Sequence, residues 1–417
     1  INGANLYALG GASLLLPNAD SFTGGILTID GPGSLDAPLL AAIDNSRFTL
    51  SGGAQFRSAA TSYSATGLLG NHTLFSASGP GTLLNLSSFE SINDTHYTRY
   101  YANVHWIRAT AGGAIDLSGV TSITSPTEGG DRTDFIVESG GHIDLAALDF
   151  LDTRGGPFRF YINTPSFTLP SLTTAESTTF YMRPGSLLDL PLLDSWNGGS
   201  MSVPTGGTFQ LPELLGVSGV TVSIGQGGTL DVPKLTSFVG SLLYLGANQT
   251  LGAPQFENID NSRFYLTGGV NFSVAATSYS ATGLVGNYTP FSAEGSGTLL
   301  DLSTLQSIND YYYARYNTNV HTIRAASGGQ IDLSGVTSIT NPQETADRLD
   351  FVVESGGQID ITALETTEAS SGAVRFAIND SEFALPKLTL GENLTFAMQI
   401  GATVDLPLLQ TWDRGSI

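Results

Sequence analysis

The chain has 417 residues, a formal net charge of −21, 50 glycines and no cysteine. A surface this acidic repels phosphate backbones and anionic lipid, so we expect no nucleic-acid partner and no attraction to an anionic membrane surface. The lack of cysteine excludes a disulfide framework, a thiolate metal site and a thiol nucleophile.

From the N-terminus onward, the sequence divides into short strand-like segments separated by glycine corners. The corners fall near residues 10, 31, 52, 79, 112, 140, 185, 206, 227, 246 and 268. The usual step of about 19 to 22 residues is the length of one coil of a parallel β-helix, and the gap from 140 to 185 is expected to hold two coils. No apolar stripe with helical spacing is sustained anywhere, so we expect no amphipathic helices.

The segment 112–123 illustrates the expected coil. Ile115, Asp116 and Leu117 alternate apolar, polar and apolar, so in a strand Ile115 and Leu117 face inward and Asp116 faces solvent. The preceding pair Gly112 and Gly113 permits a positive φ at the corner.

Three consecutive coils between the corners near 52 and 140 are longer than the rest. Their extra residues fall at 60–66, 93–101 and 125–132. Because solenoids place function on such insertions, we expect neighbouring coils to build one protrusion.

A long repeat covers the whole chain. Ile43–Phe48 returns as Ile259–Phe264, an offset of 216 residues, and the other matching segments keep this offset without a gap. We therefore predict two solenoid domains, a first repeat copy at 1–216 and an incomplete second copy at 217–417, joined without a linker. Further copies are expected in a longer parent chain.

The recurring motif resembles the tandem β-solenoid repeats of giant bacterial surface and secreted adhesin-like proteins. It reads Gly-Gly, any residue, apolar, Asp, apolar, Ser or Pro, any residue, apolar, Thr, Ser, and it occurs at 112–123 and 227–238. The resemblance implies an all-β, right-handed parallel β-helix (a β-solenoid) in an extracellular or cell-surface bacterial protein, and it carries over no catalytic residues. Calcium-binding nonapeptide repeats match less well, because Ile143 stands where their third glycine belongs.

A tyrosine-rich part of the second insertion is the main binding candidate. Exposed Tyr and Arg side chains suit glycan stacking or protein contacts. Packing of the same side chains against their own coil is the alternative. The candidate residues are Tyr97, Arg99 and Tyr100, with Tyr313, Arg315 and Tyr316 in the second copy.

A repeated aspartate forms a second signal. Stacked carboxylates would repel one another and could bind a cation, but a solvated outer face explains the pattern equally well and is the interpretation we prefer. The aspartates are Asp36, Asp116, Asp144, Asp189, Asp231, Asp301, Asp332, Asp360 and Asp405.

The charged and histidine positions are assigned structural roles. The segments 131–134 and 347–350 contain two aspartates around an arginine, which favours ion pairs that fix a loop over the two carboxylates of a glycoside hydrolase. His105 and His321 lie between apolar residues and are interpreted as strand histidines, since no catalytic or metal-ligand spacing surrounds them.

These observations favour a structural or adhesive rod module that forms a stiff fibre, stalk or surface filament, with no enzyme activity, no cofactor and no metal ligands. The expected partners are neighbouring repeats of the same chain, laterally associated rods, and a cell-surface or polysaccharide ligand. No apolar run reaches membrane-spanning length, so no membrane span is expected in this fragment. The alternative is a polysaccharide-binding or polysaccharide-cleaving β-helix, which turnover of acidic polysaccharides would reveal.

Overall fold

The computed structural model describes residues 1–96, 102–252, 255–312, 318–368, 371–379, 382–399 and 401–416. Over these ranges the chain is all-β, and its parallel strands stack as a β-solenoid of about 16 turns. No helix long and apolar enough to cross a membrane occurs in them. Two compact units are present: Ile1–Leu214 with Gly227–Pro233 and Thr250–Gly252, and Leu215–Gln226 with Lys234–Gln249 and Ala253–Ile417.

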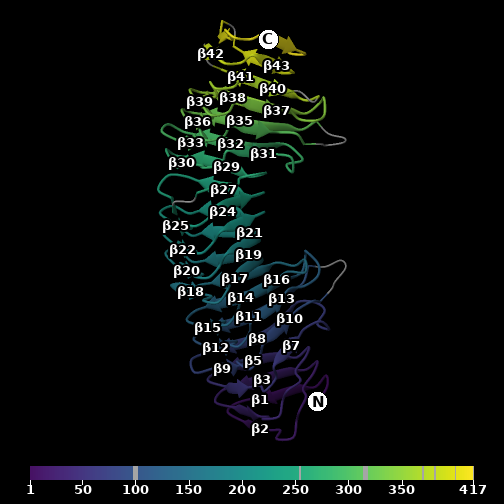
Figure 1. The fold of residues 1–417 in the computed structure, drawn as a ribbon. Coiled ribbons are helices and arrows are strands. Elements are labelled where there is room, and N and C mark those ends of the chain that lie inside the picture. The colour runs from purple at the N-terminus through teal and green to yellow at the C-terminus, as the bar shows by residue number, and fades with distance from the viewer. Residues whose placement is uncertain are drawn as a thin grey trace. The chain divides into compact units, whose positions relative to one another are not determined.

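A typical coil contributes three strands. In one coil of the first unit these are β11 (Val104–Thr110), β12 (Ala114–Asp116) and β13 (Ser122–Thr124). We name the three stacks that such strands form the main face, the lateral face and the third face. Within each unit, main-face strands lie one above the next (Figure 1).

The first unit carries most of the lateral strands. Its main-face strands are β1 (Asn5–Ala8), β3 (Ile26–Asp30), β5 (Arg47–Ser51), β8 (His72–Ser78), β11, β14 (Arg132–Glu138), β17 (Phe158–Ile162), β19 (Thr174–Met182) and β21 (Ser195–Val203). Its lateral strands are β2 (Ser13–Leu15), β4 (Ser34–Asp36), β6 (Gln55–Arg57), β9 (Leu83–Asn85), β12, β15 (His142–Asp144), β18 (Ser166–Thr168), β20 (Leu187–Asp189), β22 (Thr208–Gln210), β25 (Thr229–Asp231) and β28 (Thr250–Gly252). Its separate third-face strands are β7 (Ser62–Ser64), β10 (Ser91–Asn93), β13 and β16 (Phe150–Asp152).

The second unit repeats this plan. Its main-face strands are β24 (Thr221–Ile224), β27 (Leu242–Leu245), β29 (Arg263–Thr267), β32 (Tyr288–Glu294), β35 (Val320–Ala326), β38 (Arg348–Glu354), β41 (Ala373–Ile378) and β44 (Leu394–Met398). Its lateral strands are β30 (Asn271–Ser273), β33 (Leu299–Asp301), β36 (Gln330–Asp332), β39 (Gln358–Asp360), β42 (Glu382–Ala384) and β45 (Thr403–Asp405). Its third-face strands are β23 (Gly216–Ser218), β26 (Ser237–Val239), β31 (Ser278–Ser280), β34 (Ser307–Asn309), β37 (Ser338–Thr340), β40 (Thr366–Glu368), β43 (Leu390–Glu392) and β46 (Thr411–Asp413).

Inward side chains from the three faces form a continuous core inside each unit. Ile115 and Leu117 are fully buried and Asp116 is partly exposed, as the alternation predicts. On the main face, Phe135 stacks on Phe160 with 4.6 Å between ring centroids. Aligned register brings like side chains together in successive coils, so stacking is the source of the core.

The two glycines of a corner have different tasks. Gly112 adopts a φ of 83°, as expected for the corner. Gly113 instead packs against the preceding coil, where a Cβ atom would lie 2.5 Å from the carbonyl carbon of Ala77. The first glycine is needed for its backbone conformation and the second for close approach of two coils.

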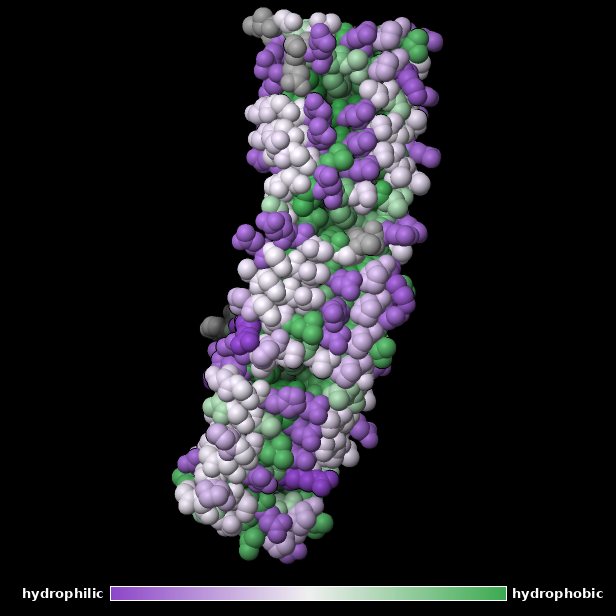
Figure 2. All heavy atoms as spheres, turned by 90° about the vertical axis from the view of Figure 1, so that its left-hand side faces the viewer, coloured by the Kyte–Doolittle hydropathy of each residue, from purple (hydrophilic) through white to green (hydrophobic). Residues whose placement is uncertain are grey.

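The lateral ladder is interrupted at the same place in both copies. β15 is the last strand of one lateral sheet and β18 starts the next, so the two coils are not hydrogen-bonded there. In the described residues of the second copy, β39 and β42 are separated in the same way. Figure 2 shows the lateral face, where apolar side chains are visible in recesses between more polar ones.

Candidate functional site

The tyrosine candidates cannot be placed. Tyr97, Arg99, Tyr100, Tyr313, Arg315 and Tyr316 all lie outside the described residues. The chain on both sides of each segment is described, and there the structure brings together a group of buried polar side chains. We call this group in the first copy the His–Asp cluster, made of Asp94, His96, His105, Asp131 and Thr133.

An aspartate–histidine pair joins the two ends of the insertion in the first copy. Asp94 directly follows β10, and His105 lies in β11. Asp94 Oδ1 is 2.5 Å from His105 Nδ1, and neither side chain is exposed to solvent. The pair therefore connects the strand before the insertion with the strand after it.

His96 adds a second imidazole to the pair. Its Nδ1 lies 3.3 Å from Asp94 Oδ1, and its Nε2 lies 3.6 Å from Asp131 Oδ2. The rings of His96 and His105 have centroids 4.0 Å apart. Two fully buried imidazoles thus lie against the carboxylate of Asp94.

The next coil completes the cluster. The Thr133 hydroxyl donates to Asp94 Oδ2 at 2.6 Å, and Asp131 Oδ1 accepts the backbone N–H of Asn103 at 2.8 Å. Asp131 directly precedes β14, which contains Thr133 and pairs in register with β11. Ladder register therefore determines which side chains meet at the base of the insertion.

The environment of the cluster shifts the pKa values of Asp94 and His96 in opposite directions. Burial alone would raise the pKa of Asp94, but hydrogen bonds from His105, His96 and Thr133 outweigh it and lower that pKa. Burial would lower the pKa of His96, but the carboxylates of Asp94 and Asp131 outweigh it and raise that pKa. A charged pair is favoured inside the cluster, which a low-dielectric interior tolerates only with such partners.

The second copy keeps the pair and replaces the second imidazole. Asp310 Oδ1 lies 2.6 Å from His321 Nδ1. Tyr312 stands where the first copy has His96, and its buried hydroxyl donates to the backbone carbonyl of Asn319 at 3.1 Å. Asp347 Oδ1 accepts the backbone N–H of Asn319 at 2.7 Å.

The second copy also changes the electrostatics. Leu349 replaces the Thr133 hydroxyl, so the carboxylate of Asp310 loses one donor. Burial, together with the nearby Asp347 carboxylate, raises the pKa of Asp310 to about 6 against the opposing effect of His321. Related positions thus hold a well-stabilised carboxylate in one copy and a poorly stabilised one in the other.

The donor set of the first copy could hold a metal ion. Asp94, His96 and His105 each offer a ligand atom, and these atoms lie within 4.8 Å of one another. Within the described ranges, no other group of three or more histidine and acidic side chains reaches this proximity. His105 and His321 were expected to be strand histidines without metal ligands around them, and the Asp-x-His motif at 94–96 is the sequence signal that points to this donor set.

The other sequence candidates have structural partners. Arg132 Nε contacts Asp134 Oδ1 at 3.1 Å and Arg348 Nε contacts Asp350 Oδ1 at 3.0 Å, so the expected ion pairs form, but within strands β14 and β38 and not across a loop. Among the repeated aspartates, Asp116 Oδ1 accepts the backbone N–H of Ser118 at 3.0 Å. Matching turns follow Asp144, Asp301, Asp332 and Asp360. These five aspartates cap the turn that follows their own lateral strands.

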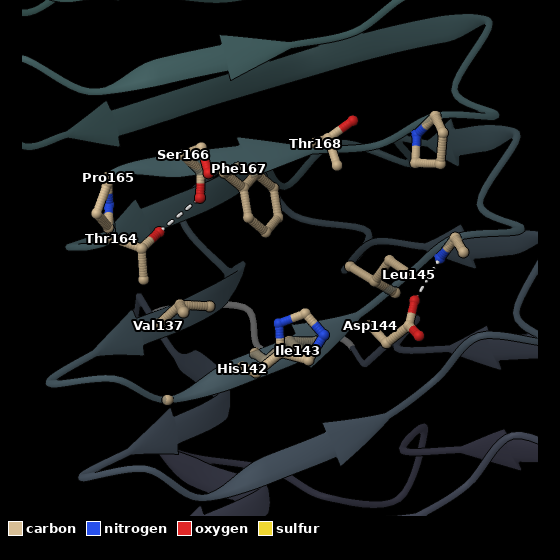
Figure 3. A pocket seen from close by; sticks show the side chains of 13 residues that line it. Val137, His142, Ile143, Asp144, Leu145, Thr164, Pro165, Ser166, Phe167 and Thr168 are labelled. Atoms are coloured by element: carbon tan, nitrogen blue, oxygen red, sulfur yellow. Dashed lines mark hydrogen bonds between the residues drawn. The ribbon is translucent and has the colours of Figure 1, made fainter.

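A cavity of about 390 Å³ opens where the lateral ladder is interrupted in the first copy. Figure 3 shows Phe167 of β18 and His142 of β15 on opposite sides of it. A counterpart of about 360 Å³, lined by Phe383, lies between β39 and β42. Both are shallow recesses between coils, with few convergent polar groups.

Comparison of the chain with models of protein families, with curated proteins and with solved structures finds no match.

Proposed function

We propose that the chain is a structural and adhesive rod module of a large extracellular or cell-surface repeat protein. The observation that supports it most strongly is that both copies build the same ladder. Val104 pairs with Arg132 and Val320 with Arg348, and each pairing continues over seven residues. A repeat that reproduces its own register is suited to extension by further copies.

The insertions are the proposed adhesive elements. Each is held at its base by a buried aspartate–histidine pair, Asp94 with His105 and Asp310 with His321. A rigid base below a tyrosine-rich segment lowers the entropy lost on binding, because the two strands that carry it are already fixed. Neighbouring rods or a cell-surface glycan are the proposed partners.

Electron microscopy of the native parent protein tests the scaffold role. With nine or ten coils per copy and about 4.8 Å per coil, thin rods should show an axial repeat on the order of 45 Å. Compact particles without an axial repeat would contradict the proposal.

Polysaccharide binding is the second candidate, favoured by tyrosines on the outer main face. Tyr161 stacks on Tyr181 with centroids 4.8 Å apart, and Tyr244 stacks on Tyr265 at 5.2 Å. Tyr181 and Tyr244 are 43% and 45% exposed. Paired rings of this kind offer a flat surface to a sugar.

A panel of acidic and neutral polysaccharides, each measured for binding and for turnover, separates the two candidates. Binding that is lost in Tyr181→Ala with Tyr244→Ala, without turnover, would favour a glycan-binding rod. Turnover by the wild-type chain would replace the scaffold proposal with an enzyme.

A further inference from the structure

We propose that the His–Asp cluster of the first copy binds one divalent first-row transition-metal ion of the Zn²⁺ type, held by Nε2 of His96 and of His105 with the carboxylate of Asp131, while Asp94 orients both rings. This site is independent of the rod function. It assigns the two copies different roles, since only the first has the second imidazole.

The contacts of His96 and His105 with Asp94 orient both rings and leave Nε2 of each available to a metal ion. Each Nδ1 lies beside Asp94, while His96 Nε2 and His105 Nε2 are buried and have no hydrogen-bond partner among the described residues. A buried ring nitrogen without a partner is costly, and a metal ion is one of the few groups that can satisfy it. An imidazole that donates from Nδ1 to a carboxylate while its other nitrogen binds metal is a common arrangement in metal sites.

The composition of the cluster selects the class of ion. Two imidazoles with a carboxylate suit Zn²⁺ and its neighbours, whereas Mg²⁺ and Ca²⁺ prefer oxygen ligands alone. The side chains of His96, His105 and Asp131 are all fully buried, so an ion held by them is shielded from solvent. Thr133 and the backbone N–H of Asn103 hold the two carboxylates in place.

His72 is close but already occupied. Its ring centroid is 5.7 Å from that of His105, but Nδ1 contacts Arg47 at 3.3 Å and Nε2 contacts the Leu69 carbonyl at 3.0 Å. We therefore do not include it among the ligands.

The second copy supplies a natural control. Tyr312 replaces His96 and keeps a phenol whose pKa is raised by burial and by Asp310, so it stays a neutral donor to Asn319. With one imidazole fewer, the second copy should bind no ion. The full chain should therefore bind one equivalent of Zn²⁺ and not two.

Zinc binding to the chelator-treated full chain tests the proposal. Calorimetric titration with Zn²⁺, with bound metal counted by elemental analysis after gel filtration, should give one equivalent. Substitution of Co²⁺ should give visible absorption bands typical of nitrogen and oxygen ligands. The absence of bound metal would overturn the proposal. Bound Co²⁺ that gives only the spectrum of the hydrated ion would overturn it as well.

The variant His96→Tyr copies the second repeat, which folds with tyrosine at this position. It should weaken Zn²⁺ binding by more than about 100-fold while leaving the circular dichroism spectrum unchanged. Unchanged affinity would overturn the site.

The reverse graft, Tyr312→His with Leu349→Thr, keeps the proposal testable if His96→Tyr is poorly folded. It should raise the count from one to two equivalents. A count that stays at one would contradict the ligand set proposed here.

Discussion

At the residue scale, one difference separates the two insertion bases. His96 contributes a titratable ring between Asp94 and Asp131, whereas Tyr312 contributes a hydroxyl that bonds across the insertion to Asn319. Both side chains are buried at the base of the insertion, but only the histidine has its pKa raised by the neighbouring carboxylates. The same backbone arrangement can therefore hold a second imidazole at the base of the insertion, as in the first copy, or a tyrosine, as in the second.

The raised pKa of Asp310 predicts a stability that depends on pH. Its folded-state pKa of about 6 exceeds the ordinary value of 3.8, so the folded chain holds this proton more tightly than the unfolded chain. The contribution of protonated Asp310 to the free energy of unfolding is fully present below pH 3.8 and is lost as the pH rises through about 6. The loss is on the order of 3 kcal/mol, at about 1.36 kcal/mol per pKa unit.

Urea unfolding of the wild-type chain and of Asp310→Asn measures this effect. The variant has no carboxyl to ionise, and its amide oxygen can still accept from His321. Relative to wild type, the variant should gain stability between about pH 4 and pH 7. If the difference in the free energy of unfolding between variant and wild type is the same at pH 4 and at pH 7, the pKa of Asp310 is not raised by folding.

The second glycine of a corner should not tolerate a side chain. A Cβ on Gly141 would lie 2.1 Å from the carbonyl oxygen of Ala109 in the preceding coil. Gly141→Ala should therefore lower the free energy of unfolding by roughly 1–3 kcal/mol or more, because the two coils must move apart. The control is Gly129→Ala, where the nearest atom is 3.7 Å away and thermal unfolding should be almost unchanged. Equal melting temperatures for both variants would contradict the close-approach argument.

At the element scale, the three faces of a coil are not equally continuous. The seven-residue pairings of β11 with β14 and of β35 with β38 hold the main face together. The lateral strands are only three residues long, and their ladder is interrupted between β15 and β18. Stability in a solenoid is a sum of nearest-neighbour terms, so an interruption is a local weak point.

Hydrogen exchange should reveal this weak point in both copies. We expect backbone amides of β18 and β42 to exchange faster than those of β12 and β36, which have hydrogen-bonded lateral neighbours on both sides. Mass spectrometry of peptic fragments from the full chain would resolve the four segments. Equal protection of all four would mean that the interruption does not weaken the lateral face.

At the scale of the whole molecule, the repeat explains why one architecture recurs. The offset of 216 residues carries the insertion, the aspartate–histidine pair and the lateral interruption into each copy at matching positions. Function in such an array depends on what differs between copies as well as on what recurs. The exchange of His96 for Tyr312 is the difference that the metal-binding proposal uses.

The sequence by itself determined the architecture, because the relevant signals are local and periodic. Glycine corners, the alternation around Asp116 and the fixed offset together predicted parallel coils, and their burial and pairing confirm it. Each signal acts within one coil, so it can be recognised without knowing what lies above or below.

Only the tertiary structure decided which polar side chains meet. Asp94, His105 and Thr133 lie on neighbouring coils, and ladder register places His105 and Thr133 against the carboxylate of Asp94. The tight contact of Gly113 with Ala77 and the interruption after β15 are likewise relations between coils. Spacing along the chain carries no information on such relations, because insertions of different length separate the partners, and their proximity depends on the stacked register.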